Sequence, residues 1–288
     1  MITFFSNPRP FKDPFDQIQR NAIQSWKRVC PDCQIILFED EEGTTFKAAE
    51  EIGVQFVKDR QTSQFGTPML NSSFKKAKEM YNSEVIVQIS TDIILTDNFV
   101  PSVQRLLKIM KGKPFFMSGR RWDLDISEKI DFTQENWQKK IMGLAKKQGK
   151  LHGLSAMDYW VLSRNIPFEF PPFVIGRIGT DSWLVYKLRS MNIPVVDATE
   201  VIDIIHQSHP YPRKVEDSFI IEEKRNIRLA GGLTNLLTLR EADWLLTKQG
   251  LIRPKFPRRI FSELALFYPW RILFLLKRKI NRLLKNGK

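Results

Sequence analysis

The sequence predicts an α/β domain built on a mainly parallel sheet, and three observations lead to this prediction. The chain has 288 residues, 42% of them hydrophobic, which is enough to bury a large core. Short apolar runs alternate with longer segments whose apolar residues recur at helical spacing. Such alternation is typical of a parallel sheet with helices on both faces. We find no internal repeat and no low-complexity tract.

The first third of the chain supplies these elements in turn. Residues 2–5 form a short apolar strand that ends at Asn7-Pro8-Arg9-Pro10, because proline cannot continue a ladder. Between Phe15 and Trp26, apolar residues follow one another at three- and four-residue intervals, which predicts a helix. The pattern then predicts a strand at 35–38, a helix near 44–52, a strand at 54–57, a helix at 70–80 and a strand at 84–89.

The pattern continues through the middle of the chain. It predicts a helix at 98–110, a strand at 114–118, a polar helical region at 127–150, a helix at 182–191 and strands at 195–197 and 201–205. Ligands of parallel sheets bind beyond the carboxyl ends of the strands. Asp92 follows the strand at 84–89, and His206 follows the strand at 201–205. We therefore expect both side chains at that edge of the sheet.

The net charge of +13 is concentrated in one segment. Residues 253–288 hold 11 Lys or Arg and one acid, whereas residues 1–252 hold 34 Lys or Arg against 31 Asp or Glu. We therefore divide the chain into a nearly neutral domain, 1–252, and a basic tail, 253–288. A nearly neutral domain speaks against nucleic acid as the partner.

The tail has the pattern of an amphipathic helix. From Leu273 onward apolar residues keep helical spacing with cations opposite them, but the apolar run is too short to span a bilayer. This pattern predicts a helix that lies on an anionic membrane surface. The residues expected to contact the membrane are Trp270, Arg271, Phe274, Lys277 and Arg278. A C-terminal helix docked on the domain is the alternative.

The cysteines and the N-terminus indicate the compartment. The two cysteines, in Cys30-Pro31-Asp32-Cys33, are too few for a zinc site, and we expect two free thiols in a helix-to-strand loop. The first residues, MITFFSNPRP, lack the features of a signal peptide. We therefore expect a cytoplasmic protein, associated peripherally with the inner face of the plasma membrane.

Four segments in this order resemble the GT-A glycosyltransferases. They are GRRWDLDI (119–126), HGLSAMDYW (152–160), PPFVIGRIGTDSWLVYKLR (171–189) and PVVDATEVIDIIHQSH (194–209). The group they resemble most is the family-2-like, or nucleotide-diphospho-sugar transferase, group of bacterial polysaccharide assembly. The resemblance covers residues 1 to about 250. It implies a Rossmann-like nucleotide-binding sandwich, but a fold alone does not license a function.

The resemblance implies that the turn after strand 84–89 holds a divalent cation, Mn²⁺ or Mg²⁺, against the donor's diphosphate. The triplet in that place is Ser90-Thr91-Asp92, in which the first acid of the family's DxD motif is missing. Asp92 is the expected ligand, and a turn-capping role is its alternative. The resemblance adds His206 as a second ligand, whose alternative is an ordinary loop histidine. We do not favour His209, because it adjoins Pro210.

A second pair of acids competes with Asp92. Asp123 and Asp125 have the spacing of a DxD motif but follow a later strand, where the fold usually builds the acceptor side. With Arg120 and Arg121 they are expected contacts of the donor sugar or the diphosphate. The resemblance adds Asp158, placed to accept hydrogen bonds from sugar hydroxyls.

Two residues of the third segment complete the predicted site. The resemblance implies that Asp181 is the catalytic base, which takes the proton of the acceptor hydroxyl. An ordinary helix N-cap is the alternative for Asp181. Arg177 is a candidate for binding a diphosphate or an acidic sugar.

The nucleotide contacts are implied by position. The loop with Asn7 and Arg9 and the segment with Gly66 and Thr67 stand where GT-A enzymes hold the base and the ribose. Asn71 lies one helical turn before Lys75 and reaches the same pocket, although Lys75 also fits a solvated helix face. Ser90 and Thr91 complete the predicted nucleotide contacts.

These features together predict a glycosyltransferase. The expected donor is a nucleotide sugar, with UDP as the commonest nucleotide, and the expected acceptor is a saccharide or a lipid-linked glycan, as in O-antigen or capsule assembly. Two alternatives remain open. One is a sugar-nucleotide nucleotidyltransferase, and the other is a catalytically inactive GT-A module that binds glycan or acts as a scaffold.

Overall fold

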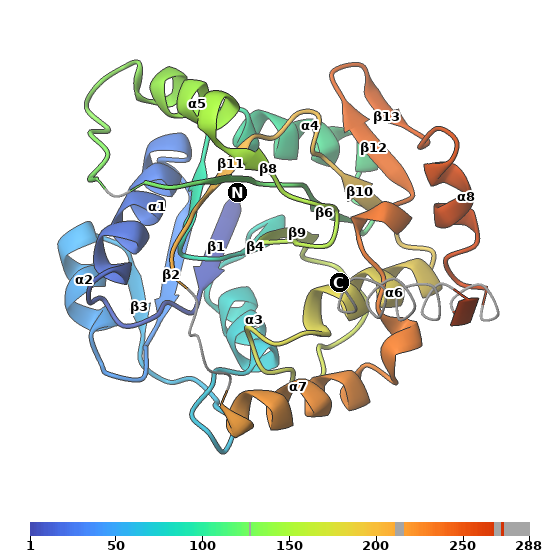
Figure 1. Cartoon of the computed structure of the whole chain (residues 1–288), viewed down its shortest axis with the longest axis horizontal. Helices are drawn as coiled ribbons and strands as arrows, with labels where there is room; N and C mark the ends of the chain where they lie inside the picture. Colours follow the sequence, from blue (N-terminus) through green and yellow to red (C-terminus); the bar gives the residue numbers. More distant parts are fainter. Residues whose placement is uncertain (127, 211–215, 268–271, 274–288) are drawn as a thin grey trace, which may run out of the picture.

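A nine-stranded sheet runs through the computed structural model, which describes residues 1–126, 128–210, 216–267 and 272–273 (Figure 1). The strand order is β13-β12-β10-β6-β9-β4-β1-β2-β3. In chain order the strands are β1 (Ile2–Ser6), β2 (Gln34–Phe38), β3 (Gln55–Val57), β4 (Val85–Ile89), β6 (Phe116–Ser118), β9 (Tyr159–Ser163), β10 (Val195–Asp197), β12 (Trp244–Thr247) and β13 (Gly250–Ile252).

Most of the ladders in this sheet are parallel. β1 pairs in parallel with both β2 and β4, and β10 pairs in parallel with β6 and β12. The exception at the centre is β9, which is antiparallel to β4 and to β6. The prediction of a mainly parallel α/β sheet is confirmed. The strand expected at 201–205 begins later and does not belong to this sheet.

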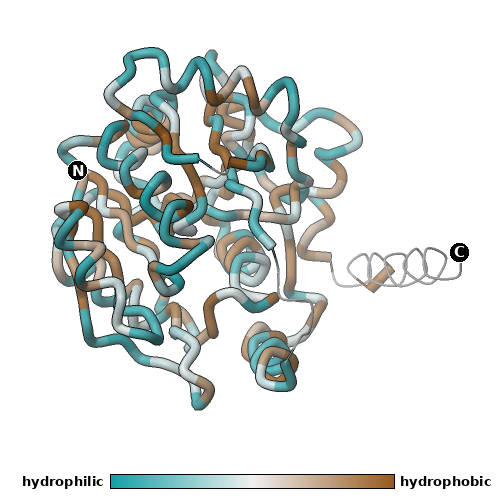
Figure 2. The backbone as a smooth tube through the Cα atoms, turned by 60° about the vertical axis from the view of Figure 1, so that its left-hand side comes forward, coloured by the Kyte–Doolittle hydropathy of each residue, from teal (hydrophilic) through white to brown (hydrophobic). Residues whose placement is uncertain are grey.

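Helices cover both faces of the sheet, because the strand side chains alternate between two apolar cores. Phe4 belongs to the core shared with α1 and α4, whereas Phe5 belongs to the core shared with α3 and α6. The helices are α1 (Phe15–Val29), α2 (Thr45–Ile52), α3 (Leu70–Met80), α4 (Phe99–Met110) and α6 (Thr180–Ser190). Along the helices of Figure 2, hydrophobic and hydrophilic residues alternate, as expected for one buried side and one exposed side.

A second, four-stranded sheet stands beside the first, in the order β5-β11-β7-β8. Its strands are β5 (Ile93–Leu95), β7 (Trp122–Leu124), β8 (Lys150–Leu151) and β11 (Ile204–Gln207). One face is covered by α5 (Trp137–Gln148), which packs Trp137 and Ile141 against Ile94 and Ile205. This small sheet carries most of the site described below.

The C-terminal part of the described chain returns to the edge of the large sheet. It contains α7 (Asp217–Leu229), two short 3-10 helices, η1 (Leu233–Asn235) and η2 (Leu239–Glu241), the β12-β13 hairpin and α8 (Arg258–Glu263). α8 lies within the predicted basic tail and packs against η2. The residues expected to contact the membrane, Trp270, Arg271, Phe274, Lys277 and Arg278, lie outside the described residues.

The loop between α1 and β2 differs from the prediction of free thiols. Cys30 and Cys33 are joined by a disulfide there. The backbone makes this pairing easy, because the Cys33 N–H donates to the Cys30 carbonyl and brings the two Cα atoms within 5.4 Å. None of the helices in the described part of the chain has the length and apolar character needed to cross a bilayer.

Candidate active site

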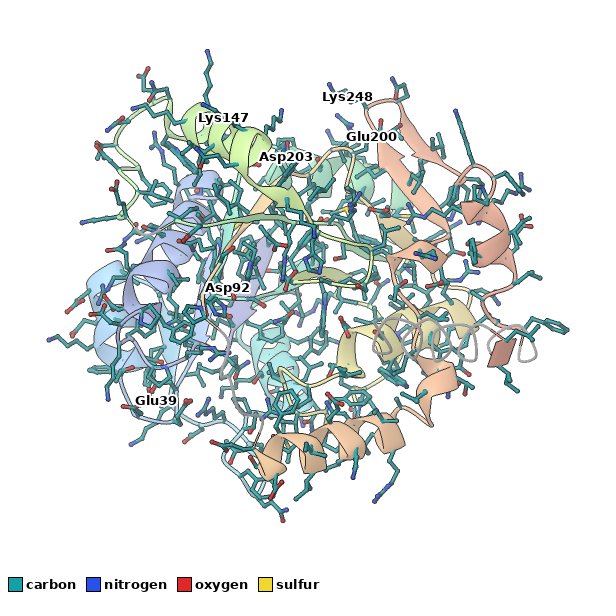
Figure 3. The ribbon with its side chains drawn as sticks, viewed as in Figure 1. Glu39, Asp92, Lys147, Glu200, Asp203 and Lys248 are labelled. Atoms are coloured by element: carbon teal, nitrogen blue, oxygen red, sulfur yellow. A yellow bond between two sulfur atoms is a disulfide. The ribbon has the colours of Figure 1, made fainter. Side chains whose placement is uncertain are left out.

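The register of the small sheet brings together residues that are far apart in the sequence. His206 lies inside β11, where it pairs with Ile93 of β5 on one side and with Asp123 of β7 on the other. Asp92 immediately precedes β5 and follows the turn after β4. Paired residues on neighbouring strands share a face, so His206 and Asp123 point the same way. Figure 3 labels Asp92, which lies away from the outer edge of the molecule in that view.

Asp92 is held between two imidazoles. Its Oδ2 lies 3.4 Å from His206 Nε2 and 3.3 Å from His209 Nε2. One ligand atom from each of the three residues lies within 4.8 Å of the others. His209, which we did not favour from the sequence, therefore joins Asp92 as closely as His206 does. The loop after β11 turns back over the site, which adjacency to Pro210 did not prevent.

These three residues fit a divalent transition metal. Asp92 Oδ1 and His206 Nδ1 are buried without a hydrogen-bond partner among the described residues. His206 Nδ1 does lie 3.3 Å from Asp123 Oδ1, but the two atoms are not aligned for a hydrogen bond. Buried polar atoms without a partner are costly unless a ligand satisfies them. One carboxylate and two imidazoles form a donor set suited to Mn²⁺ and other transition metals.

The Asp92 carboxyl is ionised in this setting. Burial raises the pKa of Asp92, but hydrogen bonds to His206 and His209 lower it more, so the pKa lies well below its usual range. A carboxylate must be deprotonated to bind a metal. The carboxyl is therefore already in the state that coordination requires.

A buried arginine joins two further acids to this cluster. Arg121 donates from Nε to Asp123 Oδ1 at 2.8 Å and from Nη1 to Asp158 Oδ1. Asp158 ends the loop before β9 and keeps its Oδ2 buried with no partner in the described part of the chain. Burial raises the pKa of Asp158 above its usual range, although Arg121 opposes this rise. The free Oδ2 is an acceptor available to a ligand hydroxyl.

His152 extends the same network toward solvent. Its Nδ1 lies 2.7 Å from Asp123 Oδ2. Arg120 supports this loop by donating to the carbonyls of His152 and Leu151. Arg120 is thus used in holding the loop, and Asp125 is exposed beyond the end of β7. Of the predicted Asp123/Asp125 pair, the structure brings only Asp123 into the cluster.

Asp181 lies in the first turn of α6, close enough to Asp158 for the two charges to interact. The N-cap is Gly179, with φ of 114°, so Asp181 is not the helix cap that the sequence alternative proposed. Its Oδ1 accepts the Ser182 N–H at 2.7 Å. Burial raises the pKa of Asp181 to about 6, and the nearby charge of Asp158 raises it further than the Ser182 hydroxyl lowers it. A carboxyl with this pKa can take up and release a proton near neutral pH.

The site carries an excess of negative charge. Asp123 and Asp158 share the permanent cation Arg121, and the charges of Asp92 and Asp181 interact with that of Asp158. Like charges in a partly buried cluster raise the free energy of the folded state unless a cation compensates them. The electrostatics therefore favour binding of a positive ion or of a cation together with its anionic ligand.

The predicted nucleotide contacts fall into two groups, and the first adjoins the Asp92 cluster. Gln19 Oε1 accepts from the Thr91 hydroxyl at 2.8 Å and from the Arg9 N–H at 2.8 Å, which ties the loop after β1 to the turn after β4. The Arg9 guanidinium lies 4.6 Å from the Phe15 ring centroid, and that ring contacts His209. Ser90 donates its N–H to the Asp158 carbonyl at 2.9 Å.

Two amides, Asn7 in the loop after β1 and Asn71 at the start of α3, have buried polar atoms without partners among the described residues. Asn7 Oδ1 accepts from the Ser73 hydroxyl at 3.1 Å, but Asn7 Nδ2 has no partner within the described ranges. The same holds for Asn71 Oδ1 and for Arg60 Nη1. A buried donor and a buried acceptor without partners are suited to the polar edge of a base or to a ribose.

The second group lies around α7. Arg177 pairs with the fully buried Glu222 at 2.7 Å, and Thr67 donates its hydroxyl to the same carboxylate at 3.1 Å. Arg177 also stacks on Phe219, with 4.3 Å to the ring centroid. Gly66 adopts a φ of +81° in this loop. No contact given for the described residues joins Arg177, Gly66 or Thr67 to Asp92, so their predicted ligand roles remain predictions.

Glu222→Gln is expected to lower the free energy of unfolding by about 2–4 kcal/mol, because it leaves the Arg177 guanidinium without its carboxylate in a mostly buried place. Chemical denaturation measures this change. As a matched control, Glu223→Gln, at a half-buried position of α7 that makes no ion pair within the described residues, should change stability by less than about 0.5 kcal/mol. Equal stability of the two variants would contradict the role of Glu222 as the anchor of this loop.

Sequence reasoning missed several residues of the site. His209, His152, Gln19 and Arg60 had no assigned role, and Glu222 was not singled out. A signal existed for His209 and His152, since the chain contains only three histidines and the site uses all of them. Gln19 and Glu222 carried no such signal, because a polar residue in a helix is usually part of its exposed face.

Comparison with known proteins identifies the fold class of the chain. No protein-family model matches the sequence, and a search of curated proteins finds no match. Among solved structures, a mannosyltransferase from Pyrobaculum calidifontis in complex with GDP-Man and Mn²⁺ matches with a TM-score of 0.50 at 11% identity, covering 94% of this chain and 71% of that one. This chain has the GT-A fold.

Other matches to the GT-A chain are more distant. Glucosyl-3-phosphoglycerate synthase from M. tuberculosis has a TM-score of 0.45 and 12% identity, over 81% of each chain. The S. aureus protein TarS in complex with UDP-GlcNAc has a TM-score of 0.49 and 9% identity, over 82% of this chain and 72% of that one. Because a shared fold does not fix an activity, the chemistry of the GT-A chain has to be argued from its site.

Proposed function

We propose that the chain is a metal-dependent glycosyltransferase that moves a sugar from a nucleotide-diphospho-sugar to a saccharide or lipid-linked glycan. The observation that carries this proposal is the pairing of the Asp92, His206 and His209 cluster with a second carboxyl, Asp181, whose pKa is raised to about 6. The likeness in fold to a mannosyltransferase supports it.

Asp92, His206 and His209 would hold the ion. When bound, a divalent cation supplies the positive charge that neutralises a departing nucleoside diphosphate. The chain's own contribution is to keep the three ligand atoms within 4.8 Å and Asp92 ionised. Because Ser90 stands in place of the missing acid, the turn offers one metal ligand fewer than a DxD motif. His209 would supply the replacement ligand.

Asp158 and Arg121 orient the donor sugar. Arg121 fixes one carboxylate oxygen of Asp158, which leaves the buried Oδ2 to accept a hydrogen bond from a sugar hydroxyl. Arg121 also holds Asp123, so the two acids have a fixed separation. A rigid acceptor atom of this kind selects the orientation of the sugar ring before reaction.

Asp181 takes the proton. A pKa of about 6 leaves it mostly ionised at pH 7, yet basic enough to accept a proton from an acceptor hydroxyl as that oxygen attacks the anomeric carbon. The proton moves to the Asp181 carboxylate, the new glycosidic bond forms at the hydroxyl oxygen, and the bond to the diphosphate oxygen breaks. Direct attack of this kind inverts the configuration of the anomeric carbon.

The nucleotide would occupy the side of the site formed by β1 and α3. Asn7 Nδ2 and Asn71 Oδ1 offer a donor and an acceptor to the base or the ribose. Arg9 stacks on Phe15, whose ring contacts His209, and would offer its charge to the diphosphate. UDP is the nucleotide we expect. A lipid-linked acceptor, such as an O-antigen or capsule precursor, suits a protein with a basic, apolar tail at the cytoplasmic face of the plasma membrane.

A donor panel tests this proposal. The chain is incubated with a series of UDP-, GDP- and dTDP-sugars and Mn²⁺, and released nucleoside diphosphate is measured with and without EDTA. We expect slow, EDTA-sensitive hydrolysis of one donor, because water replaces the absent acceptor. If no donor in the panel is hydrolysed although donor binding is retained, the result would indicate an inactive binding module. Formation of a nucleotide sugar from a sugar phosphate and a nucleoside triphosphate would indicate a nucleotidyltransferase.

The identity of the ion gives a sharper prediction. Mn²⁺ should support donor hydrolysis at least about tenfold better than Mg²⁺ at equal concentration, since Mg²⁺ binds imidazole poorly. Titration of each ion against the initial rate measures the difference. His209→Gln should narrow it by removing one nitrogen ligand. Equal support by both ions in the unaltered chain would contradict coordination by His206 and His209.

A further inference from the structure

The segment around α8 docks on the domain through one side only. The buried or half-buried residues within 254–265 recur mostly at helical spacing: Pro254, Arg258, Phe261, Ser262, Leu264 and Ala265. Arg258 pairs with the buried Asp197 at 2.8 Å and donates to the Leu239 carbonyl. Ala265 is 2% exposed and belongs to the core shared with α6. Because this side is held against the domain, the opposite side of the segment faces away from it.

The opposite side presents apolar side chains to solvent. Phe256 is 78% exposed, Phe267 is 59% exposed and Ile260 is 40% exposed. Two cations accompany them. We define the outer α8 face as Lys255, Phe256, Arg259, Ile260, Leu266 and Phe267, all of them exposed.

The charge of this face is positive. Its acidic neighbour Glu263 accepts from Arg259 Nε at 2.6 Å and is thereby neutralised, while Lys255 has no such acid beside it in the ion pairs given for the described residues. Isolated exposed apolar residues are common on proteins, but aromatic and aliphatic residues gathered with cations on one face mark an interaction site.

We propose that the outer α8 face is a membrane-contact surface of the folded domain, which inserts Phe256, Ile260 and Phe267 among anionic lipid headgroups. This inference deepens the membrane association proposed above for the tail, and it rests on that proposal. Two arguments favour lipid as the occupant. Cations flanking aromatic residues complement an anionic bilayer. The face also continues directly into a segment, 268–288, that adds seven further Lys or Arg and no acid.

A docked contact would orient the enzyme on the membrane. α8 follows β13, which is one edge strand of the large sheet, whereas β3 is the other edge (Figure 1). The nucleotide side, formed by β1 and α3, lies toward the β3 edge. The outer α8 face and the nucleotide side would therefore lie toward opposite edges of the large sheet, and the donor would enter away from the bilayer.

Vesicle binding of the full-length chain tests the proposal. Sedimentation with phosphatidylcholine vesicles, with and without about a third phosphatidylglycerol, measures partition onto a neutral and an anionic surface. Phe256→Ser with Ile260→Ser should weaken partition onto the anionic vesicles on the order of tenfold or more. The matched control, Phe46→Ser with Leu144→Ser, removes two comparably exposed side chains elsewhere and should bind like the unaltered chain.

A local probe separates this face from the tail. Ile260→Cys labelled with an environment-sensitive fluorophore should brighten and shift to shorter wavelength on anionic vesicles, while the same label at Gln55→Cys, on the β3 edge, should not. Cys30 and Cys33 are paired and do not compete for the label.

Three results would overturn the proposal. Vesicle binding with no response at position 260 would assign binding to the tail alone. A response that follows protein concentration without vesicles would assign the face to a second copy of the chain. Failure to bind vesicles at all would remove the membrane contact, and the donor-hydrolysis assay, which needs no lipid, would report separately whether the proposed activity stands.

Discussion

Asp92→Asn is expected to lower the release of nucleoside diphosphate by at least about a hundredfold and to abolish its stimulation by Mn²⁺. The substitution keeps the shape of the side chain but removes the negative charge that both imidazoles face. An amide is a weak ligand for a divalent ion, so His206 and His209 alone would hold the metal poorly. Mn²⁺ titrations of hydrolysis and of donor binding measure the loss.

The control for this variant is Asp125→Asn. Asp125 belongs to the literal DxD pattern at 123–125 but is exposed beyond β7, and its loss should leave the rate within about twofold. The reverse result, with Asp125 needed and Asp92 dispensable, would move the metal site to the acid pair that sequence spacing alone suggested. Circular dichroism of both variants establishes that the fold is intact.

Asp181→Asn should separate activity from stability. Transfer to an acceptor should fall by about 10²–10⁴, the range for loss of a general base, while Mn²⁺-dependent donor binding persists. At the same time the free energy of unfolding should rise by up to about 3 kcal/mol at pH 7. The amide oxygen can still accept the Ser182 N–H, so the substitution removes the charge and keeps the hydrogen bond.

The sign of the stability effect follows from the raised pKa. Burial moves the pKa of Asp181 from 3.8 to about 6, so between these values the folded chain holds a proton that the unfolded chain has lost. Stability of the unaltered protein therefore falls as pH rises through this window, and the full penalty applies above about pH 6. The Asn variant lacks this penalty, and its advantage should vanish near pH 4.

The pH dependence of the rate provides the matching kinetic test. Below about pH 6 the transfer rate of the unaltered enzyme should fall close to tenfold per pH unit as Asp181 becomes protonated. The residual activity of Asp181→Asn should lack this limb. A variant that retains both the rate and the limb would show that another group takes the proton, and His152, held by Asp123 at 2.7 Å, would be the next residue to change.

The large sheet could be predicted because its strands are apolar and its helices amphipathic. β1, β2 and β4 are buried on both faces, which produces uninterrupted apolar runs, and α1, α3 and α4 repeat their apolar residues at helical spacing. The direction of β9 could not be predicted, because an antiparallel strand between parallel neighbours has the same residue pattern. Local sequence sets the element, and tertiary pairing sets its direction.

The small sheet was mostly invisible in the sequence. β5 and β7 have three residues each, too short for any periodicity, and β11 begins at Ile204 and not at residue 201. Asp92 and His206 could still be expected near one another, because both follow apolar runs that end at one edge. The position of His209 could not be predicted, because it depends on how the chain turns after β11. That turn is set by tertiary contacts, which include those of His209 with Phe15 and Asp92.

The predicted role of Arg177 shows another limit. Its place before a helix in a glycine-rich segment suggested an anion ligand, yet its guanidinium pairs with Glu222, 45 residues later in the chain. A long-range ion pair leaves no local trace in a sequence. Its ligand role and those of Gly66 and Thr67 remain predictions that the donor-binding assays above would test.

The central position of β11 in the small sheet also has a consequence for how the protein acquires its site during synthesis. β5 and β7 do not pair with each other, and both pair with β11, which leaves the ribosome about 110 residues after Asp92. Until residues 204–207 are in place, Asp92 faces neither imidazole, and Asp123 has a ladder neighbour on one side only, Lys150 of β8. A nascent chain that ends before residue 204 thus already contains the strands of its nucleotide side and all four clustered acids, but lacks the two imidazoles that would retain the ion. Metal retention is then an indicator that translation has passed this strand, and a truncated product released earlier would carry the acidic cluster without His206 and His209.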